Sequence, residues 1–588
     1  MTEILLALVK ALAVVMFSMN VAVVLTWADR RQGAMFNDRV GPNRAVIFLP
    51  ARLVQALALL PALAATGLVL TSLVASPAIG PDRTGRAMLF TQLAILFLWL
   101  TGLFIAGRIR NRGPRGSVDL FFAQLGDPRR FFYAGLAAHL VTLGVGAALR
   151  ATPLGVQLRE VAYHGAPMLF LFAVVGGALY AVASLQGEEK VGLRLLGLLH
   201  PAADGLKSLF KEDLIPPRAD RLLHGLAPMI SLFPALVVLA VVPFGDTLCF
   251  ESKDGNWGSL LPNVPAQGVC HNGAVPLQVM DANVGLLFFF ALAGTGIVGA
   301  ALAGWASNSK FSLLGGLRAA SQMVSYEVTL GLTLIGALMV YGTLRVDEMV
   351  RWQANNAWGI FVQPLAFVLF FAAAIAEAKR TPFDLPEGES ELVAGYFTEY
   401  SGMKFAMFFF SEYIAIVSSS AVMAALFFGG WHLPFLQRDG LHVAVGDTVL
   451  IHHALSHGWV VAMGAAGFVA KVLTLCWLQL AIRWTLPRFR YDQLMRLGWR
   501  KLLPTSLFNI LVTGLVILMI QSASTQFLRG LAVAADVTQL ILAIAGAVGL
   551  VLFVRFILRP AEHQAVTAST AAQFANARGG TQSARMGA

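Results

Sequence analysis

The 588-residue sequence has few charged residues and only three cysteines. Asp, Glu, Lys and Arg make up 13% of it and 57% is hydrophobic, which is far too apolar for a water-soluble protein of this length. It contains no CxxC pair, no glycine-rich fingerprint between a strand and a helix, and no P-loop. These absences argue against an iron–sulfur cluster, a bound dinucleotide or ATP chemistry on this chain, and the composition indicates a membrane protein.

Long uncharged stretches predict the fold class, because about 20 helical residues cross the hydrocarbon core of a bilayer. We expect an all-α, polytopic transmembrane helical bundle with about 13 transmembrane helices. The thirteen windows are 11–28, 53–76, 87–107, 131–149, 161–187, 222–245, 282–309, 319–341, 357–377, 404–430, 458–482, 502–528 and 537–554. The exceptions that matter for function are Glu327 in the eighth window, Lys404 with Glu412 in the tenth, and Lys471 in the eleventh.

The distribution of basic residues predicts the orientation, since Lys and Arg are retained on the cytoplasmic side. With the N-terminus outside and the C-terminus cytoplasmic, 31 of the 43 basic residues fall in inner segments and ten in outer ones. The net charge of +11 therefore reflects topology, and we expect no nucleic-acid binding. Arg30 and Arg31 follow the first apolar run where a signal peptide would have a cleavage site, so a retained first helix is expected.

The cysteines and histidines give little chemistry. Cys249 and Cys270 lie in the predicted outer loop 246–281, where a disulfide and two free thiols are equally open. Cys476 sits in a span as a packing residue. His453 and His457 have helical spacing but no nearby carboxylate or cysteine, so we expect a solvated loop there and no metal site.

The inner segment 376–413 carries seven carboxylates and three basic residues. Thr381 and Pro382 have the form of a helix start, with the threonine as N-cap and the proline at the first helical position. Glu387 and Glu391 are then expected four residues apart on one helical face. Like charges at that spacing repel, unless cations neutralise them or one carboxylate keeps a proton.

A solvated acidic loop is one interpretation of this charge run. We favour a partly buried acidic cavity, because aromatic and aliphatic residues interleave the acids. They are Phe383, Leu385, Leu392, Val393, Tyr396, Phe397, Tyr400 and the run 405–410. Glu327, Glu412 and Lys471 lie at membrane depth, where an ionisable group is costly and indicates function. They could form a structural carboxylate–lysine pair or a relay that carries protons inward.

A second inner segment, 200–217, predicts a short amphipathic helix that ends at Pro216 and Pro217. One stripe is apolar and the other polar, which fits an interfacial helix or a docking surface equally well.

Five segments together resemble a known family. They are GPNRA (41–45), ADGLKSLFKEDLIPP (203–217), LAGWASNSKFSLLGGLRAASQMVSYE (302–327), AEAKRTPFDLPEGESELVAGYFTEYSGMKFAMFFFSEY (376–413) and LPRFRYDQLMRLGWRKLLP (486–504). In this order they are similar to the H-type membrane subunit of proton-translocating NADH:quinone oxidoreductase, the counterpart of mitochondrial complex I subunit 1. The resemblance covers residues 1–45 and about 199–530.

The resemblance implies a subunit that couples quinone reduction to proton translocation in the inner (plasma) membrane of a bacterial-type cell. The substrate would be ubiquinone or menaquinone, and this chain would carry no redox centre. FMN and iron–sulfur clusters would belong to partner subunits. The implied partners are hydrophilic quinone-site and iron–sulfur subunits, small membrane subunits and antiporter-like subunits, within the lipid bilayer.

The resemblance and the buried charges together assign two sets of site residues. The expected proton path and quinone coupling involve Glu327, Glu377, Asp384, Glu387, Glu389, Glu391, Glu399, Glu412 and Lys471. The expected quinone chamber and its mouth involve Arg39, Asn43, Arg44, Asp204, Lys207, Lys211, Arg380, Phe383, Tyr400 and Lys404.

The sequence also departs from the family pattern. About 150 residues with four predicted spans separate the first two motifs, where family members have a short loop, and an extra span follows at the end. The expected regions are 1–45 (first helix and start of the quinone-side loop), 46–198 (inserted four-helix region), 199–530 (core with eight family helices, counting the first), 531–560 (extra helix) and 561–588 (disordered tail).

Two alternatives stay open beside the respiratory enzyme. The same subunit type occurs in membrane-bound hydrogenases, although the complete 377–406 motif favours the quinone enzyme. A stand-alone ion-coupled transporter would also use acidic residues at depth, but we find no internal repeat of the kind that such transporters often show.

Overall fold

The structure is a computed structural model that describes residues 2–37, 198–253, 256–261, 274–445 and 448–558, with short segments and single positions elsewhere. The four predicted spans of the insertion and the predicted tail 561–588 lie outside the described residues. Contacts divide the chain into two units: Met1–Pro42 with His200–Leu550, and Asn43–Leu199 with Val551–Ala588. The roles predicted for these regions stay predictions.

In the second unit, the structure describes one antiparallel pair of strands. β1 (Ile47–Pro50) pairs with β2 (Lys190–Leu193), so that Ile47 lies opposite Leu193 and Pro50 opposite Lys190. The two strands come from the two ends of the predicted insertion. The insertion therefore leaves and re-enters the chain at neighbouring points.

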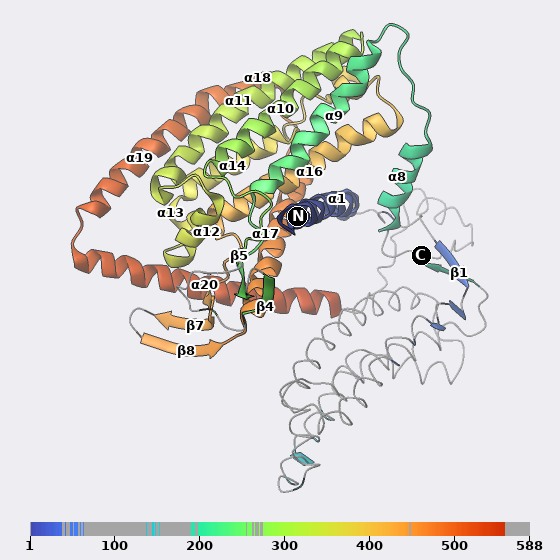
Figure 1. The fold of residues 1–588 in the computed structure, drawn as a ribbon. Coiled ribbons are helices and arrows are strands. Elements are labelled where there is room, and N and C mark those ends of the chain that lie inside the picture. The colour runs from blue at the N-terminus through green and yellow to red at the C-terminus, as the bar shows by residue number, and fades with distance from the viewer. Residues whose placement is uncertain are drawn as a thin grey trace, which may run out of the picture. The chain divides into compact units, whose positions relative to one another are not determined.

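The first unit is a bundle of helices (Figure 1). In chain order these are α1 (Thr2–Phe36), α8 (Leu199–Phe210), α9 (Arg221–Val237), η3 (Val238–Val241), α10 (Gly285–Ala306), α11 (Lys310–Tyr341), α12 (Val346–Asn355), α13 (Gly359–Val362), α14 (Pro364–Glu377), α15 (Glu389–Leu392), η4 (Gly395–Phe397), α16 (Gly402–Phe427), α17 (His457–Thr485), α18 (Tyr491–Arg496), η5 (Leu497–Leu502), α19 (Leu503–Gln521) and α20 (Thr525–Leu558).

Among the described residues, eight helical segments are long and apolar enough to cross a membrane. They are Ile4–Ala34, Arg221–Val241, Gly285–Ala306, Lys310–Tyr341, Gly402–Phe427, His457–Thr485, Tyr491–Gln521 and Thr525–Gly546. The expected all-α, multi-pass membrane fold is confirmed, whereas the count of 13 and the orientation stay predictions.

The predicted span 357–377 differs from the expectation. It is divided at Gln363 into the four-residue α13 and the 14-residue α14. Pro364 starts α14, because proline lacks the N–H that would continue the preceding helix. The helix that precedes the acidic segment is therefore shorter than a full membrane crossing.

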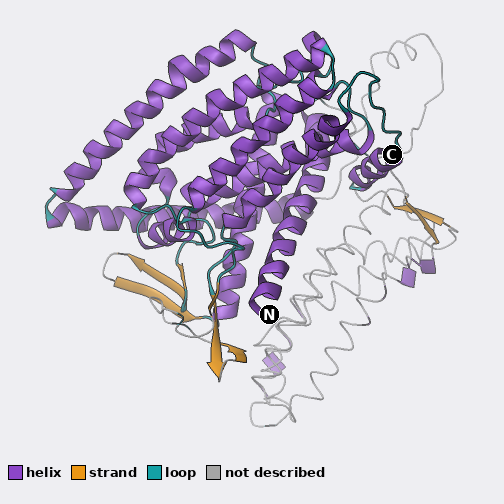
Figure 2. Cartoon of the chain, turned by 45° about the horizontal axis from the view of Figure 1, so that its top comes forward, coloured by secondary structure: helices purple, strands orange, loops and turns teal. Residues whose placement is uncertain are grey.

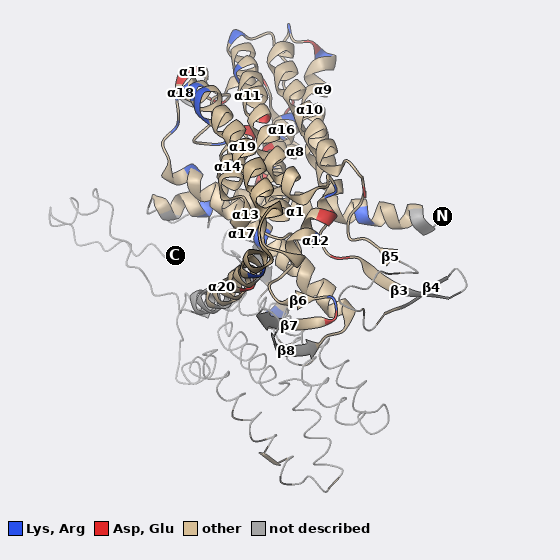
Figure 3. Cartoon of the chain, turned by 90° about the vertical axis from the view of Figure 1, so that its left-hand side faces the viewer, with Lys and Arg blue, Asp and Glu red and all other residues tan. Residues whose placement is uncertain are grey.

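α16 lies at the centre of the bundle, where every residue from Ile416 to Phe427 is buried. It packs against α1, α9 and α17, while α11 packs against α10, α14 and α19. Figure 2 shows that the described long helices of this unit lie side by side. By contrast, α8 buries no residue, and no described side chain of α20 is fully buried. Figure 3 shows that charged residues are sparse along the long helices and gather at their ends.

Two small antiparallel sheets lie in the predicted outer loops. The first has the order β4-β3-β5, with β3 (Leu248–Lys253), β4 (Asn256–Leu260) and β5 (Ala274–Val275). The second has the order β6-β7-β8, with β6 (Leu436–Gln437), β7 (Gly440–Val445) and β8 (Thr448–Ala454). His453 thus belongs to a strand and His457 to a helix, so their helical spacing is not formed. The predicted solvated loop is wrong for His457, which is fully buried. No group of three metal-ligating side chains occurs in the described part of the chain.

The open question of the outer cysteines is resolved, since Cys249 and Cys270 form a disulfide with their Cα atoms 5.4 Å apart. Cys476 is a buried free thiol, as its place in a span suggested. Disulfides persist in oxidising compartments, which agrees with the predicted outer side for this loop.

We predict that Cys249→Ser lowers the free energy of unfolding of the purified protein by about 3 kcal/mol. The reason is that the disulfide joins two residues 21 positions apart and so restricts the unfolded chain between them. Thermal unfolding followed by differential scanning fluorimetry measures the effect. The double variant Cys249→Ser/Cys270→Ser should be no less stable than either single variant. Additive losses would mean that the two thiols act independently and that no bond joins them.

Candidate functional site

The acidic segment forms an irregular loop, residues 378–401, between α14 and α16. The predicted helix start at Thr381 is wrong: Thr381 and Pro382 lie in a turn. The backbone groups that a helix would pair are instead used by tertiary contacts. The N–H of Phe489 donates to the carbonyl of Pro382 at 3.0 Å.

Gln322 of α11 holds this loop from the other side. Its buried side-chain amide donates to the carbonyl of Ala376 at 2.7 Å and to that of Phe383 at 2.6 Å. One side chain therefore ties the end of α14 to the loop and sets the positions of the acids on either side.

Two glycines allow the loop to lie directly on α11. A Cβ on Gly315 would stand 2.7 Å from Cα of Gly395, which is closer than any side chain tolerates. Gly395 itself has φ +55°, and a Cβ there would overlap the carbonyl of Pro386.

The predicted shared face of Glu387 and Glu391 is also wrong, because Gly388 between them adopts a left-handed conformation with φ +42°. Glu391 is largely exposed and its Oε2 pairs with Arg318 of α11 at 2.7 Å. Glu387 is half-buried. The expected repulsion at helical spacing therefore does not arise.

Glu412, on the first half of α16, is the most deeply buried carboxylate of the site at 2% exposure. Tyr396 donates to its Oε1 at 3.2 Å, and Lys379 donates in turn to the Tyr396 hydroxyl at 3.1 Å. The guanidinium of Arg380 lies 3.1 Å from Oε2. Burial lowers the pKa of Lys379, while the charge of Glu412 opposes that shift.

The polar network continues to α1 and α17 through Tyr413. The guanidinium of Arg380 lies over the ring of Tyr413, 4.3 Å from its centroid, and the Tyr413 hydroxyl donates to Asp29 at 2.8 Å. Asp29 is buried, pairs with Arg483 and accepts a hydrogen bond from Trp484 at 2.9 Å. A buried carboxylate with three partners connects the first helix to the acidic loop.

Asp384 forms a second buried pair. It is 3% exposed, and its Oδ2 lies 2.7 Å from Arg488 in the segment after α17. Burial raises the pKa of Asp384 despite the opposing charge of Arg488. Asp384 thus ties the loop to the segment after α17. The expectation that one of the crowded glutamates keeps a proton stays a prediction.

A cavity of about 60 Å³ lies beside these groups. Glu377, Lys379 and Glu412 line it, together with four serines and apolar residues of α9, α10, α11, α14 and α16. The serines are Ser231, Ser411, Ser418 and Ser419. A water molecule needs roughly 10–15 Å³ measured this way, so the cavity has room for about four. It joins two of the predicted proton-path carboxylates to hydroxyl groups deeper in α16.

Other predicted residues lie around the periphery of this centre. Glu327 of α11 lies against Gly294 of α10 and is half-buried. Lys404 pairs with Asp213 at 2.8 Å, and the exposed Asp204 pairs with Arg30 at 2.7 Å.

The two predicted chamber aromatics pack within the protein. Phe383 stacks on Phe489 with ring centroids 5.4 Å apart, and Tyr400 stacks on His224 at 4.0 Å. The carbonyl of Glu399, whose side chain is half-buried, faces His224 at 3.4 Å.

Three groups of predicted residues stand apart. Lys207 and Lys211 are exposed at and just after the end of α8. Lys471 lies near the opposite end of α16 from Glu412, against the carbonyl of Phe428. Arg39, Asn43, Arg44 and the side chain of Glu389 lie outside the described residues.

Sequence patterns missed five residues that hold the site together: Asp29, Arg318, Gln322, Arg483 and Arg488. Counting charges within 376–413 left its acids short of cations, but two further cations come from elsewhere in the chain: Arg318 of α11 pairs with Glu391, and Arg488 after α17 pairs with Asp384. Two quoted motifs contained such residues: 302–327 holds Arg318 and Gln322, and the arginine-rich 486–504 holds Arg488, but neither sequence shows which groups these side chains contact.

We predict that Gln322→Leu destabilises the loop by on the order of 2 kcal/mol, because two buried carbonyls lose their donor. Limited proteolysis of the assembled protein measures the effect as faster cleavage within 378–401. Ser321→Ala is the matched control, since that hydroxyl donates to the carbonyl of Leu317 within its own helix. Equal cleavage rates in the two variants would contradict the role given to Gln322.

Comparison with known proteins gives one family. Residues 159–514 match the NADH dehydrogenase family. The chain is 44% identical over 378 residues to the first H-type subunit of the NADH-quinone oxidoreductase of Geobacter sulfurreducens, which covers 63% of this chain and 99% of that relative. It is 45% identical over 355 residues to the second such subunit of Geobacter metallireducens (59% and 92%), and 42% identical over 350 residues to the first one of Cytophaga hutchinsonii (58% and 92%).

Proposed function

Since the chain belongs to the NADH dehydrogenase family and is a membrane subunit of an NADH:quinone oxidoreductase, we propose that its loop 378–401 contributes to the quinone chamber and that its buried carboxylates couple quinone reduction to proton translocation. The observation that carries the proposal is the contact of Glu412 with Arg380 and Tyr396 beside a cavity with room for water. The quinone is the substrate, ubiquinone or menaquinone. FMN and iron–sulfur clusters belong to the partner subunits.

The electrostatics of this site support coupling. Quinone reduction takes up two electrons and two protons, so negative charge develops at the loop before the protons arrive. Lys379 and Arg380 are buried in the loop and interact with Glu412. Negative charge added near these two cations changes the extent to which they stabilise the ionised form of Glu412. The proton affinity of Glu412 then follows the state of the quinone.

The cavity supports an inward continuation of the proton path. Glu377 and Glu412 both line it, and the hydroxyls of Ser231 and Ser411 lie 3.0 Å apart at its wall. Glu327 lies nearby on α11 and interacts electrostatically with Glu377. In our proposal, waters in this cavity carry protons between Glu412, Glu377 and Glu327.

The remaining predicted residues take more peripheral places in the proposal. Asp384 holds the loop through Arg488, and Phe383 and Tyr400 shape it by packing. Asp204, Lys207 and Lys211 lie on or just after α8, which buries none of its own residues and is therefore available to a hydrophilic partner subunit. Glu387, Glu399 and Lys404 complete the loop, and Glu389, Arg39, Asn43 and Arg44 are assigned to the chamber by resemblance alone.

We predict that Glu412→Gln lowers quinone-linked NADH oxidation at least tenfold in membranes, because a neutral amide removes the charge that Arg380 and Lys379 surround. Reduction of an artificial acceptor upstream of the quinone should be unchanged. Glu387→Gln should act in the same direction. Glu391→Gln should act more weakly, because that carboxylate is 59% exposed.

Glu348→Gln serves as a control for this series. Glu348 lies on α12, and its half-exposed carboxylate contacts Thr343 and Arg345. Unchanged quinone-linked activity in Glu412→Gln would exclude the proposed coupling. Loss of the upstream activity as well would indicate failed assembly.

We also predict that mild detergent extraction yields a large multi-subunit assembly with flavin and iron–sulfur absorbance. Quinone reduction by that assembly distinguishes the respiratory enzyme from a hydrogenase, which would evolve or consume hydrogen. A stable lone chain with ion-transport activity would contradict both and favour the transporter.

A further inference from the structure

The C-terminal end of α16 is held by side chains from three other helices. The last carbonyls of a helix have no partner within it, and a buried helix end needs donors from elsewhere. The hydroxyl of Tyr341 donates to the carbonyl of Leu426 at 2.6 Å. The amide of Gln353 donates to the carbonyl of Ala425 at 2.7 Å. The third donor is Lys471 of α17.

Lys471 closes the turn that follows α16. Its Nζ donates to the carbonyls of residues 428, 430 and 432 at 2.7, 2.9 and 2.6 Å. The ammonium also lies 4.3 Å from the ring centroid of Trp358, which adds a cation–π contact. An ammonium has three N–H donors and an amine has two, so the three carbonyls match the charged form.

The backbone conformation of this turn directs the three carbonyls toward Lys471. Gly429 and Gly430 have φ +69° and +49°, a left-handed conformation that side chains rarely adopt. Trp358 packs against Gly429 and donates from Nε1 to Nδ1 of His432 at 3.5 Å. Burial, with the charge of Lys471 nearby, lowers the pKa of His432 to about 3, so that this imidazole stays neutral beside the ammonium.

Lys471 is separate from the carboxylates of the candidate site. Among the described residues, its partners are the three carbonyls and the ring of Trp358, and no carboxylate lies within ion-pair distance. Residues 412 and 428 are about 24 Å apart along a helix at 1.5 Å per residue. The ammonium instead faces the end of α16, where a positive charge complements the helix dipole.

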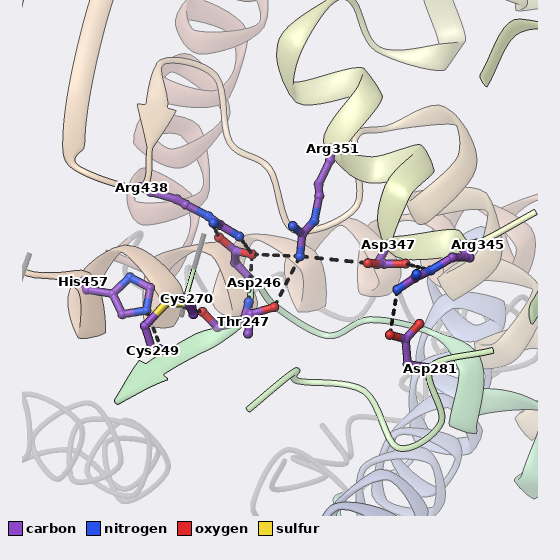
Figure 4. A network of polar contacts seen from close by, with 10 residues as sticks. All are labelled: Asp246, Thr247, Cys249, Cys270, Asp281, Arg345, Asp347, Arg351, Arg438 and His457. Atoms are coloured by element: carbon purple, nitrogen blue, oxygen red, sulfur yellow. Dashed lines mark hydrogen bonds and ion pairs between the residues drawn. A yellow bond between two sulfur atoms is a disulfide. The ribbon is translucent and has the colours of Figure 1, made fainter. Parts of the chain in front are cut away.

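α12, which supplies Gln353, is itself fixed by an ionic network (Figure 4). Buried Asp246 accepts two hydrogen bonds from Arg438, at 2.5 and 2.7 Å, and lies 3.7 Å from Arg351 of α12. Arg345, just before α12, pairs with Asp281 at 2.7 Å. The disulfide and the contact of His457 with the N–H of Cys249, at 3.1 Å, secure the neighbouring strand.

We propose that Lys471 is a positioning residue: its ammonium closes the end of α16, holds the helix that carries Glu412 in place, and transfers no proton. This role differs from the proton relay that the sequence suggested for it. It concerns the opposite end of α16 from Glu412 and does not depend on the proposed quinone contacts.

Two substitutions separate the roles. Lys471→Met keeps the aliphatic stem and removes every donor, whereas Lys471→Gln removes the titratable proton but keeps an amide with two N–H donors. In the assembled enzyme, hydrogen–deuterium exchange of amides 424–432 should rise at least tenfold in Lys471→Met and distinctly less in Lys471→Gln. Proton translocation per NADH oxidised should stay within twofold of the parent in Lys471→Gln, with an unshifted pH profile.

Gln353→Leu gives an independent test, because it removes a second donor to the same helix end and has no titratable group. It should raise exchange over the same amides, as Lys471→Met does, even if the lysine variants assemble poorly. Unchanged exchange in Gln353→Leu would contradict the proposal that these side chains anchor the C-terminal end of α16. Equal loss of proton translocation in Lys471→Gln and Lys471→Met, at normal exchange in Lys471→Gln, would instead make Lys471 a relay member.

Discussion

A carboxylate buried in an apolar bundle must be compensated by nearby cations and hydroxyls, and the arrangement around Glu412 follows from that requirement. Arg380 and Lys379 reach it from the loop that follows α14, and Tyr396 joins them through its hydroxyl. These partners can converge because the chain leaves α14 at Glu377 and turns back against α11. The short helix α14, the irregular loop and the central position of α16 therefore all serve to compensate the buried charge of Glu412.

The same requirement explains how distant segments are held together. Asp29 of α1 would be costly to bury alone, but Tyr413, Arg483 and Trp484 surround it. Asp384 is likewise matched by Arg488. Each of these contacts joins segments that are about a hundred or several hundred residues apart in the sequence. Removing one partner leaves an uncompensated buried charge, so these contacts specify the arrangement of the helices as well as stabilise it.

The two ends of α16 have different chemistry. Around Glu412, carboxylates, cations, hydroxyls and a cavity lie together, and a change in one charge affects the others. At the other end, Tyr341, Gln353 and Lys471 satisfy backbone carbonyls with well-matched donors. The carbonyls at the C-terminal end of α16 are thus fixed by donors from three other helices, whereas the acids and cations gather around its first half.

The amino-acid sequence was enough to predict the fold class, most of the long helices of the described core, the family and the acidic segment as the place where polar chemistry gathers. These depend on hydrophobic length and on contiguous motifs, which are local properties. The folded chain was needed to see that Thr381 starts no helix, that Glu391 lies outward while Glu412 is buried, and that Lys471, within the described part of the chain, contacts carbonyls and not carboxylates. Asp29, Gln322 and Arg488 were missed for the same reason: a buried charge or amide is satisfied by partners far away in the chain, and no local pattern encodes which residues those are.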